Sequence, residues 1–193
     1  MQKIFTKDFL IDKKGCYDDS RLDKCSFMGV EPITIESILD SEIPLKDKYW
    51  FVCRKLATKE QNQQIAIDVA LITIDIYEKK YPDNKAPRKA IEAAQAYLAG
   101  TITIDELKTA LAAADAAASA ASAAVAYVDA DAYAAAAVAS AAAAAAVAYA
   151  DAYAAAAAAY AAAAYDADAA DADKKQDYKA IMLQYLKDFV KNA

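Results

Sequence analysis

The segment from Ala112 to Ala172 contains 41 alanines in 61 residues, interrupted only by Tyr, Asp, Ser and Val. Alanine has the highest helix propensity of the natural residues, and its methyl side chain lets two helix backbones approach closely. An alanine face buries little area, so stability requires many shallow contacts in addition to the Tyr and Val side chains. The segment therefore predicts closely packed helices, and the fold class we expect is an all-α, compact multi-helix bundle.

The length of 193 residues suits one domain of ordinary core size. We expect an irregular N-terminal appendage over residues 1–32, which contains Gly15 and Gly29, followed by an all-helical domain over residues 33–193. The net charge is −6, and residues 109–173 hold eight aspartates and no cation. This acidity argues against a nucleic-acid partner.

Helix start and stop signals are clear after Pro32. Thr34 can cap a short helix, Pro44 can occupy the first turn of the next, and Thr58 with Gln61 forms a capping box that opens a helix to about Lys80. That helix is apolar over much of its circumference, which places it at the centre of the core.

Similar signals divide the second half of the chain. Pro87 begins a helix that Gly100 stops, and Thr103 with Glu106 forms a second capping box. No Gly or Pro follows Gly100, so we expect polar residues to break the alanine-rich helices, near Ser119 to Ser122 and near Ser140. Residues 174–192 are amphipathic and should dock as the closing helix.

Several classes of chemistry are disfavoured by composition. The chain has no histidine, and Cys16, Cys25 and Cys53 lack a C-x-x-C spacing, which argues against zinc fingers and Ser-His or Cys-His nucleophile pairs. We therefore expect free thiols, no metal site, no cofactor and no enzymatic turnover. The N-terminus has no apolar leader, which indicates a cytoplasmic protein. The uncharged run over residues 132–150 is a weak membrane candidate, because alanine is only marginally apolar and both flanks are acidic.

The alanine-rich half offers one candidate binding surface. Tyr149 and Tyr153 share a helix face with Tyr160, and Asp151 lies opposite. These side chains, together with Asp115, could line a groove for a polar or cationic ligand. The alternative, which helical aromatic stripes favour in general, is that each tyrosine fills core space that alanine cannot.

Two arginines provide further candidates in the first half of the chain. Trp50 and Arg54 lie one turn apart and can stack as an aromatic ring and a cation. Arg88 falls in the first turn of its helix, where the macrodipole disfavours a cation, and Glu92 is the nearest acidic partner. Structural ion pairing is the interpretation we favour for both arginines.

A family resemblance covers roughly Ile33 to Lys187. It is carried by W-F-x-C-R-K at Trp50, by Y-P-x-N-x-A-P-R-x-A-I-E-A at Tyr81, and by the alanine-rich helices that follow. In these features the chain resembles an alanine-rich, all-helical family of immunity proteins from bacteria and phages. The resemblance implies an all-α immunity-like domain without established enzymatic activity.

The function that we expect is binding. The first hypothesis is an immunity-like protein that neutralises a protein toxin or defence component, and the alternative is a phage-encoded, anti-defence sponge that sequesters a small nucleotide-like signalling molecule. An alanine-rich ice-binding protein is a weaker alternative, since regularly spaced Thr is missing. We expect no nucleic-acid or membrane partner, and a homo-oligomer is possible. The candidate binding residues are Trp50, Arg54, Arg88, Asp115, Tyr149, Asp151 and Tyr153.

Overall fold

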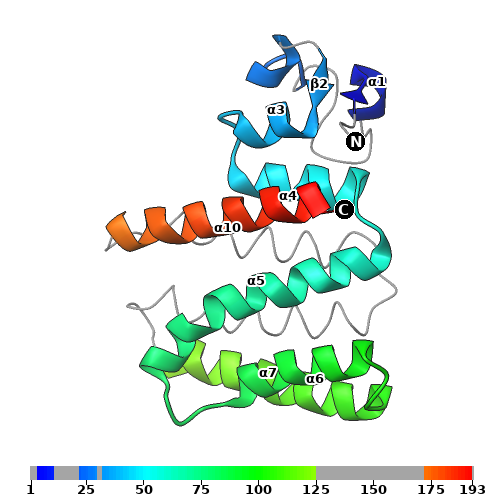
Figure 1. The fold of residues 1–193 in the computed structure, drawn as a ribbon. Coiled ribbons are helices and arrows are strands. Elements are labelled where there is room, and N and C mark those ends of the chain that lie inside the picture. The colour runs from blue at the N-terminus through cyan, green and yellow to red at the C-terminus, as the bar shows by residue number, and fades with distance from the viewer. Residues whose placement is uncertain (1–3, 11–21, 30–31, 125–171, 193) are drawn as a thin grey trace.

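The computed structural model describes residues 4–10, 22–29, 32–124 and 172–192, and these residues are mostly helical (Figure 1). The predicted all-α class is thereby confirmed, with one small addition, a two-stranded sheet near the N-terminus. Among the helices that the structure describes, none is both long enough and apolar enough to cross a membrane.

The N-terminal segments pack against the rest of the chain through a short sheet. Strand β1 (Ile4–Phe5) pairs antiparallel with β2 (Ile33–Thr34), so that Ile4 lies opposite Thr34. Helix α1 (Lys7–Leu10) and the 3-10 helix η1 (Ser26–Gly29) follow β1. Four side chains from this part enter the main hydrophobic core: Phe5, Leu10, Leu22 and Phe27. The sheet was not expected from the sequence, because strands of two residues are too short to show an alternating pattern.

The capping signals after β2 act as predicted. Thr34 accepts a hydrogen bond from the Ser37 backbone, and the Ser37 hydroxyl accepts one from the Thr34 backbone, which completes a capping box at the start of α3 (Ile35–Asp40). Helix α4 (Leu45–Lys55) begins directly after Pro44, which occupies the N-cap position and not the first turn.

Helix α5 (Lys59–Lys80) begins at the predicted capping box, where the Gln61 side chain accepts a hydrogen bond from the Thr58 backbone at 2.8 Å. Its apolar side chains are buried as expected of a central core helix, and they include Ile65, Ile67, Val69 and Ile74.

Helices α6 (Ala86–Leu98) and α7 (Ile104–Ala124) form a tightly packed pair at one end of the molecule (Figure 1). Gly100 takes a φ of 72° between them, a conformation that residues with a Cβ rarely adopt. Ala90 and Ala94 are fully buried, which allows close helix packing. The predicted break near Ser119 to Ser122 is wrong, since α7 runs through both residues to Ala124. The high helix propensity of the surrounding alanines outweighs the local competition from two serine hydroxyls. The predicted break near Ser140 lies outside the described residues.

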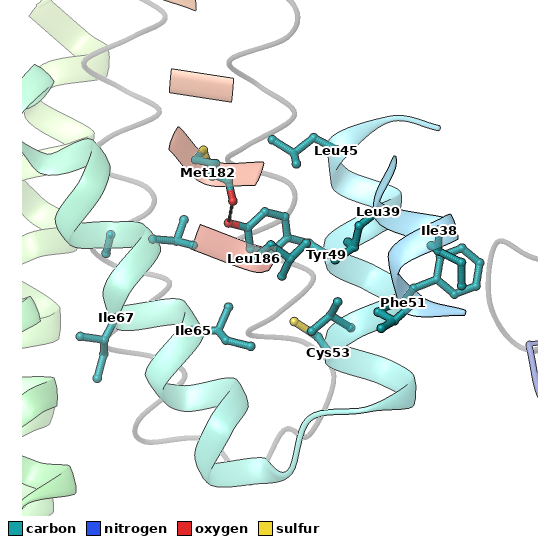
Figure 2. Close-up of a cluster of buried hydrophobic side chains, with 14 of the residues drawn as sticks. Ile38, Leu39, Leu45, Tyr49, Phe51, Cys53, Ile65, Ile67, Met182 and Leu186 are labelled. Atoms are coloured by element: carbon teal, nitrogen blue, oxygen red, sulfur yellow. Dashed lines mark hydrogen bonds between the residues drawn. The ribbon is translucent and has the colours of Figure 1, made fainter. Parts of the chain in front are cut away.

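The predicted closing helix is α10 (Ala172–Asn192), which packs against α3 and α4. Figure 2 shows Leu186 of α10 beside Tyr49 of α4, with Ile65 of α5 turned toward the same cluster, and Leu186, Tyr49 and Ile65 are all buried. The core therefore joins segments from both ends of the chain.

Candidate partner-binding surface

Polar contacts fix helix α4 in its place. The Tyr49 hydroxyl donates a hydrogen bond of 2.9 Å to the Met182 carbonyl oxygen of α10 (Figure 2), and burial raises the pKa of this hydroxyl. The Lys48 ammonium donates to the Leu39 carbonyl oxygen of α3 at 2.6 Å, and its pKa is lowered, mainly by desolvation. Each bond satisfies a polar group that would otherwise be costly to bury.

A second set of contacts ties α10 to α5 and α3. The Tyr185 hydroxyl donates a hydrogen bond of 2.7 Å to Oδ2 of Asp68, and the Gln64 amide donates one of 2.7 Å to Oδ1 of the same carboxylate. Lys187 forms an ion pair with Asp40. Desolvation and the Asp68 hydrogen bond raise the pKa of the Tyr185 hydroxyl, so it remains a donor at neutral pH. The helix that carries Trp50 and Arg54 is thus anchored on its inner side.

The C-terminal end of α4 borders an open cavity close to β1 and α1. We call this cavity the aromatic hollow, and its volume is about 440 Å³. It is lined by Ile4, Phe5, Thr6, Phe9, Lys55 and Leu56. Two of these side chains are exposed to an extent unusual for large hydrophobic residues, Ile4 at 64% and Phe9 at 47%.

A cation lies over the aromatic rings at this hollow. The Phe5 and Phe9 rings are stacked, with centroids 5.5 Å apart and an interplanar angle of 10°. The Lys55 ammonium lies 5.6 Å from the centroid of Phe9 and 6.0 Å from that of Trp50, within the range of cation-π attraction. Trp50 in turn packs edge-on against Phe51, whose side chain is buried. The hollow therefore combines apolar surface with a positive charge, and Trp50 beside it packs against the buried core residue Phe51. This combination of side chains is suited to binding another molecule.

The structure distributes the predicted binding residues over two parts of the molecule. Trp50 is half-buried and Arg54 is exposed, both on α4. Arg88 lies at the start of α6, and α4 and α6 occupy opposite ends of the stack of helices in Figure 1. These three residues are therefore not one site. The stacking of Arg54 on Trp50 stays a prediction, whereas the Lys55 ammonium does lie over the Trp50 ring.

Arg88 forms the ion pairs that were expected of it, but with different partners. Its Nε and Nη2 donate to the two oxygens of Glu78 at 2.8 Å each, and Nη2 also donates to Asp75 at 3.1 Å. The predicted partner Glu92 was wrong, because α5 ends beside the first turn of α6 and brings Glu78 closer in space than sequence spacing suggested. The hydrogen bonds from Arg88 lower the pKa of Glu78, and Glu78 raises that of Arg88. Arg88 thus joins two helices.

The remaining predicted residues cannot be placed in a site. Asp115 belongs to α7, but its side chain is outside the described part of the structure. Tyr149, Asp151 and Tyr153 also lie outside the described residues, so the groove predicted between alanine-rich helices stays a prediction.

The Cys53 thiol lacks the features of a reactive group. It is buried, and burial raises its pKa to about 12. A thiol with such a high pKa is a poor nucleophile at neutral pH. Within residues 4–10, 22–29, 32–124 and 172–192, no group of three or more Cys, Asp or Glu side chains is arranged to hold a metal ion.

Sequence reasoning missed most of the aromatic hollow. Phe5 and Phe9 are spaced four residues apart, and this spacing was the local signal. Lys55 follows Arg54 in the W-F-x-C-R-K motif, but nothing in the sequence places it against residues about fifty positions earlier. The site depends on the pairing of β1 with β2, which returns the N-terminus to the start of α3.

Comparison with known proteins gives one match. Residues 54–188 match the family described as Imm-5 like putative immunity protein, which is more than half of the chain. No curated protein matches, and no solved structure matches. Immunity proteins generally bind a cognate toxin. The matched range contains the alanine-rich segment, and the chain belongs to this family of immunity proteins.

Proposed function

We propose that this chain neutralises a protein toxin by binding it, without chemical turnover. The observation that carries the proposal is the family match over residues 54–188. The cognate toxin is not identified, so the proposal concerns the mode of action and leaves the partner's name open.

The chemistry of the described residues supports binding over catalysis. Arg88 is committed to the carboxylates of Glu78 and Asp75, and Cys53 is buried with a raised pKa. The Tyr49 and Tyr185 hydroxyls, whose pKa values are strongly raised, serve as hydrogen-bond donors between helices. By contrast, the aromatic hollow has exposed apolar and cationic side chains of the kinds that dominate protein recognition.

The test is rescue from toxicity. The chain is purified from its native host, co-purifying proteins are identified, and each is expressed in a sensitive bacterium with and without this chain. Restored growth, together with a stable complex of fixed stoichiometry and an unmodified toxin, is the expected result. Failure to restore growth with any toxic co-purifying protein contradicts the proposal.

Mass spectrometry on the same preparation distinguishes the alternative hypothesis. A small molecule that is released on denaturation, in an amount equal to that of the protein, favours sequestration of a signalling ligand. Covalently altered toxin that accumulates over many turnovers per protein molecule contradicts a mechanism based on binding alone.

A further inference from the structure

We propose that the aromatic hollow, with Trp50 beside its Lys55, is the surface on which the toxin docks, and that the docked part of the toxin is acidic with one projecting apolar side chain. This inference rests on the proposed function, which it deepens by giving the surface and the chemistry of the partner. It follows from the exposure, the charge and the position of a few described residues.

The first observation is apolar exposure on a supported surface. Ile4 and Phe9 are exposed while Phe5 between them is buried, so the exposed side chains project from a segment whose neighbour is fixed in the core. The Thr6 hydroxyl accepts a hydrogen bond of 3.3 Å from the Phe9 backbone, which holds the turn. Contiguous apolar surface beside a hollow is a common mark of a protein interaction site. A side chain inserted from a partner would cover both Ile4 and Phe9.

The second observation is local charge. The chain carries a net charge of −6, yet the described residues that line the hollow include one cation, Lys55, and no anion. Residues 4–10 are balanced by Lys7 and Asp8. Lys55 lies against two aromatic rings, where a nearby carboxylate interacts more strongly than in bulk water. Electrostatic complementarity therefore favours a partner with Asp or Glu beside its apolar anchor.

The third observation is the extent of the family match. The match begins at Arg54, so Ile4, Phe5 and Phe9 form one wall of the hollow from outside the matched range, while Lys55 and Leu56 form the other from inside it. The hollow is therefore built from residues both inside and outside the matched range, and a partner in it would contact both.

Other occupants fit the same observations less well. An anionic membrane would also attract cations and apolar groups, but the chain as a whole is acidic. A second copy of this chain would bring the same cationic surface against itself in a symmetric contact, because a two-fold dimer apposes identical patches. Both occupants are outcomes of the experiments below.

Trp50 gives a direct reading of the site, because it is the single tryptophan of the chain and lies beside Lys55. Its fluorescence is titrated with a tryptophan-free peptide that has a central Phe flanked by Asp residues. The controls are the same peptide with Lys in place of Asp and with Ala in place of Phe. We expect the acidic Phe peptide to bind at least about fivefold more tightly than either control. Binding of the acidic peptide that is no tighter than that of the basic one overturns the proposal.

Matched variants locate the interaction. Lys55→Glu should weaken binding of the acidic Phe peptide about fivefold or more, whereas Lys108→Glu, on the exposed side of α7, should leave it unchanged. Phe9→Ser should weaken it, whereas Ile181→Ser, at a comparably exposed apolar position on α10, should not. Circular dichroism and thermal melting establish that each variant is folded. Equal effects of site and control variants overturn the proposal, as does a Trp50 signal with anionic vesicles in the absence of any with the peptide.

The growth assay separates this inference from the proposed function. If the unaltered chain rescues growth and folded Phe9→Ser and Lys55→Glu variants rescue equally well, the toxin binds elsewhere and only the docking inference fails. If the unaltered chain rescues no growth, the proposed function fails, and the peptide titration still decides the chemistry of the hollow. Concentration-dependent dimerisation that Phe9→Ser abolishes assigns the hollow to a second copy and also overturns the inference.

Discussion

The two ends of this molecule are stabilised in different ways. At one end, α3, α4 and α10 meet through large side chains, and hydrogen bonds such as that from Tyr49 to Met182 cross between helices. At the other end, α6 and α7 pack closely, and the fully buried residues of α6 include two alanines, Ala90 and Ala94, beside Ile91. The first arrangement depends on large side chains and buried hydrogen bonds, whereas the second also depends on small side chains that let the helices approach.

The surface that we propose for docking lies in the first of these regions. There the aromatic hollow has exposed Ile4 and Phe9 side chains beside the half-buried Lys55. The α6–α7 pair turns tightly at Gly100 between its two helices. Aromatic side chains held in well-packed surroundings are typical of the residues that dominate binding.

The largest expected effect is loss of a large side chain from the first region. Leu186→Ala removes a fully buried side chain of α10 that packs against α4, and should lower the free energy of unfolding by about 2 to 5 kcal/mol. Ile181→Ala, on the exposed face of the same helix, is the control and should cost far less. Chemical denaturation measures both, and equal losses would show that α10 is not anchored by its buried face.

The opposite substitution tests the second region. Ala94→Leu adds volume to a fully buried position of α6 and should lower stability by about 1 to 3 kcal/mol through overpacking. Ala113→Leu adds the same volume at an exposed position of α7 and should be close to neutral. Thermal melting of the pair is the measurement. If Ala94→Leu is also neutral, the α6–α7 contact is looser than its burial indicates.

A smaller effect, at alkaline pH, distinguishes the two regions chemically. Burial raises the pKa of the Cys53 thiol from 9.0 to about 12, so the folded state holds this proton more tightly than the unfolded state. Its contribution to stability is complete below pH 9 and is lost as the pH rises toward 12, with a slope of at most about 1.4 kcal/mol per pH unit.

Cys53→Ala should therefore flatten the decline of stability above pH 9, as measured by urea denaturation between pH 8 and about pH 11. The Cys53 charge also helps to raise the pKa of the Tyr49 and Tyr185 hydroxyls, so its removal weakens the pH dependence of these two groups in the same direction and adds to the flattening. An unchanged slope would mean that the thiol ionises in the folded protein without cost.

The success of sequence reasoning depended on how local each interaction is. The capping boxes at Thr34, Thr58 and Thr103 involve residues three apart, so their pattern predicted the starts of α3, α5 and α7. At Thr34 the sequence predicted only a cap, and the reciprocal bond from the Thr34 backbone to the Ser37 hydroxyl was not predicted.

Interactions between distant segments were harder to predict. The partner of Arg88 depends on how α5 and α6 meet, and sequence spacing pointed to Glu92 on its own helix instead of Glu78. The aromatic hollow depends on a two-residue strand pair that leaves no periodic signal. Trp50 and Arg54 were identified because a tryptophan and an arginine one turn apart stand out locally, but Ile4, Phe9 and Lys55 acquire their role only in three dimensions.

The smallest expected effect concerns the second region at acidic pH. Arg88 lowers the pKa of Glu78 through two hydrogen bonds of 2.8 Å. The ion pair therefore stabilises the fold fully when the pH is above the ordinary pKa of a glutamate, and this stabilisation is lost as the pH falls through the lowered pKa of Glu78. Because both groups are partly exposed, we expect Arg88→Met to cost only about 0.5 to 1 kcal/mol at pH 7. The cost should shrink as the pH is lowered, since protonated Glu78 no longer attracts the guanidinium.

Lys108→Met, at an exposed pair with Asp105 at 3.9 Å, is the control and should change stability little at any pH. A cost of Arg88→Met that is the same at acidic and neutral pH would show that the arginine stabilises α5 and α6 by packing of its aliphatic stem and not by its charge.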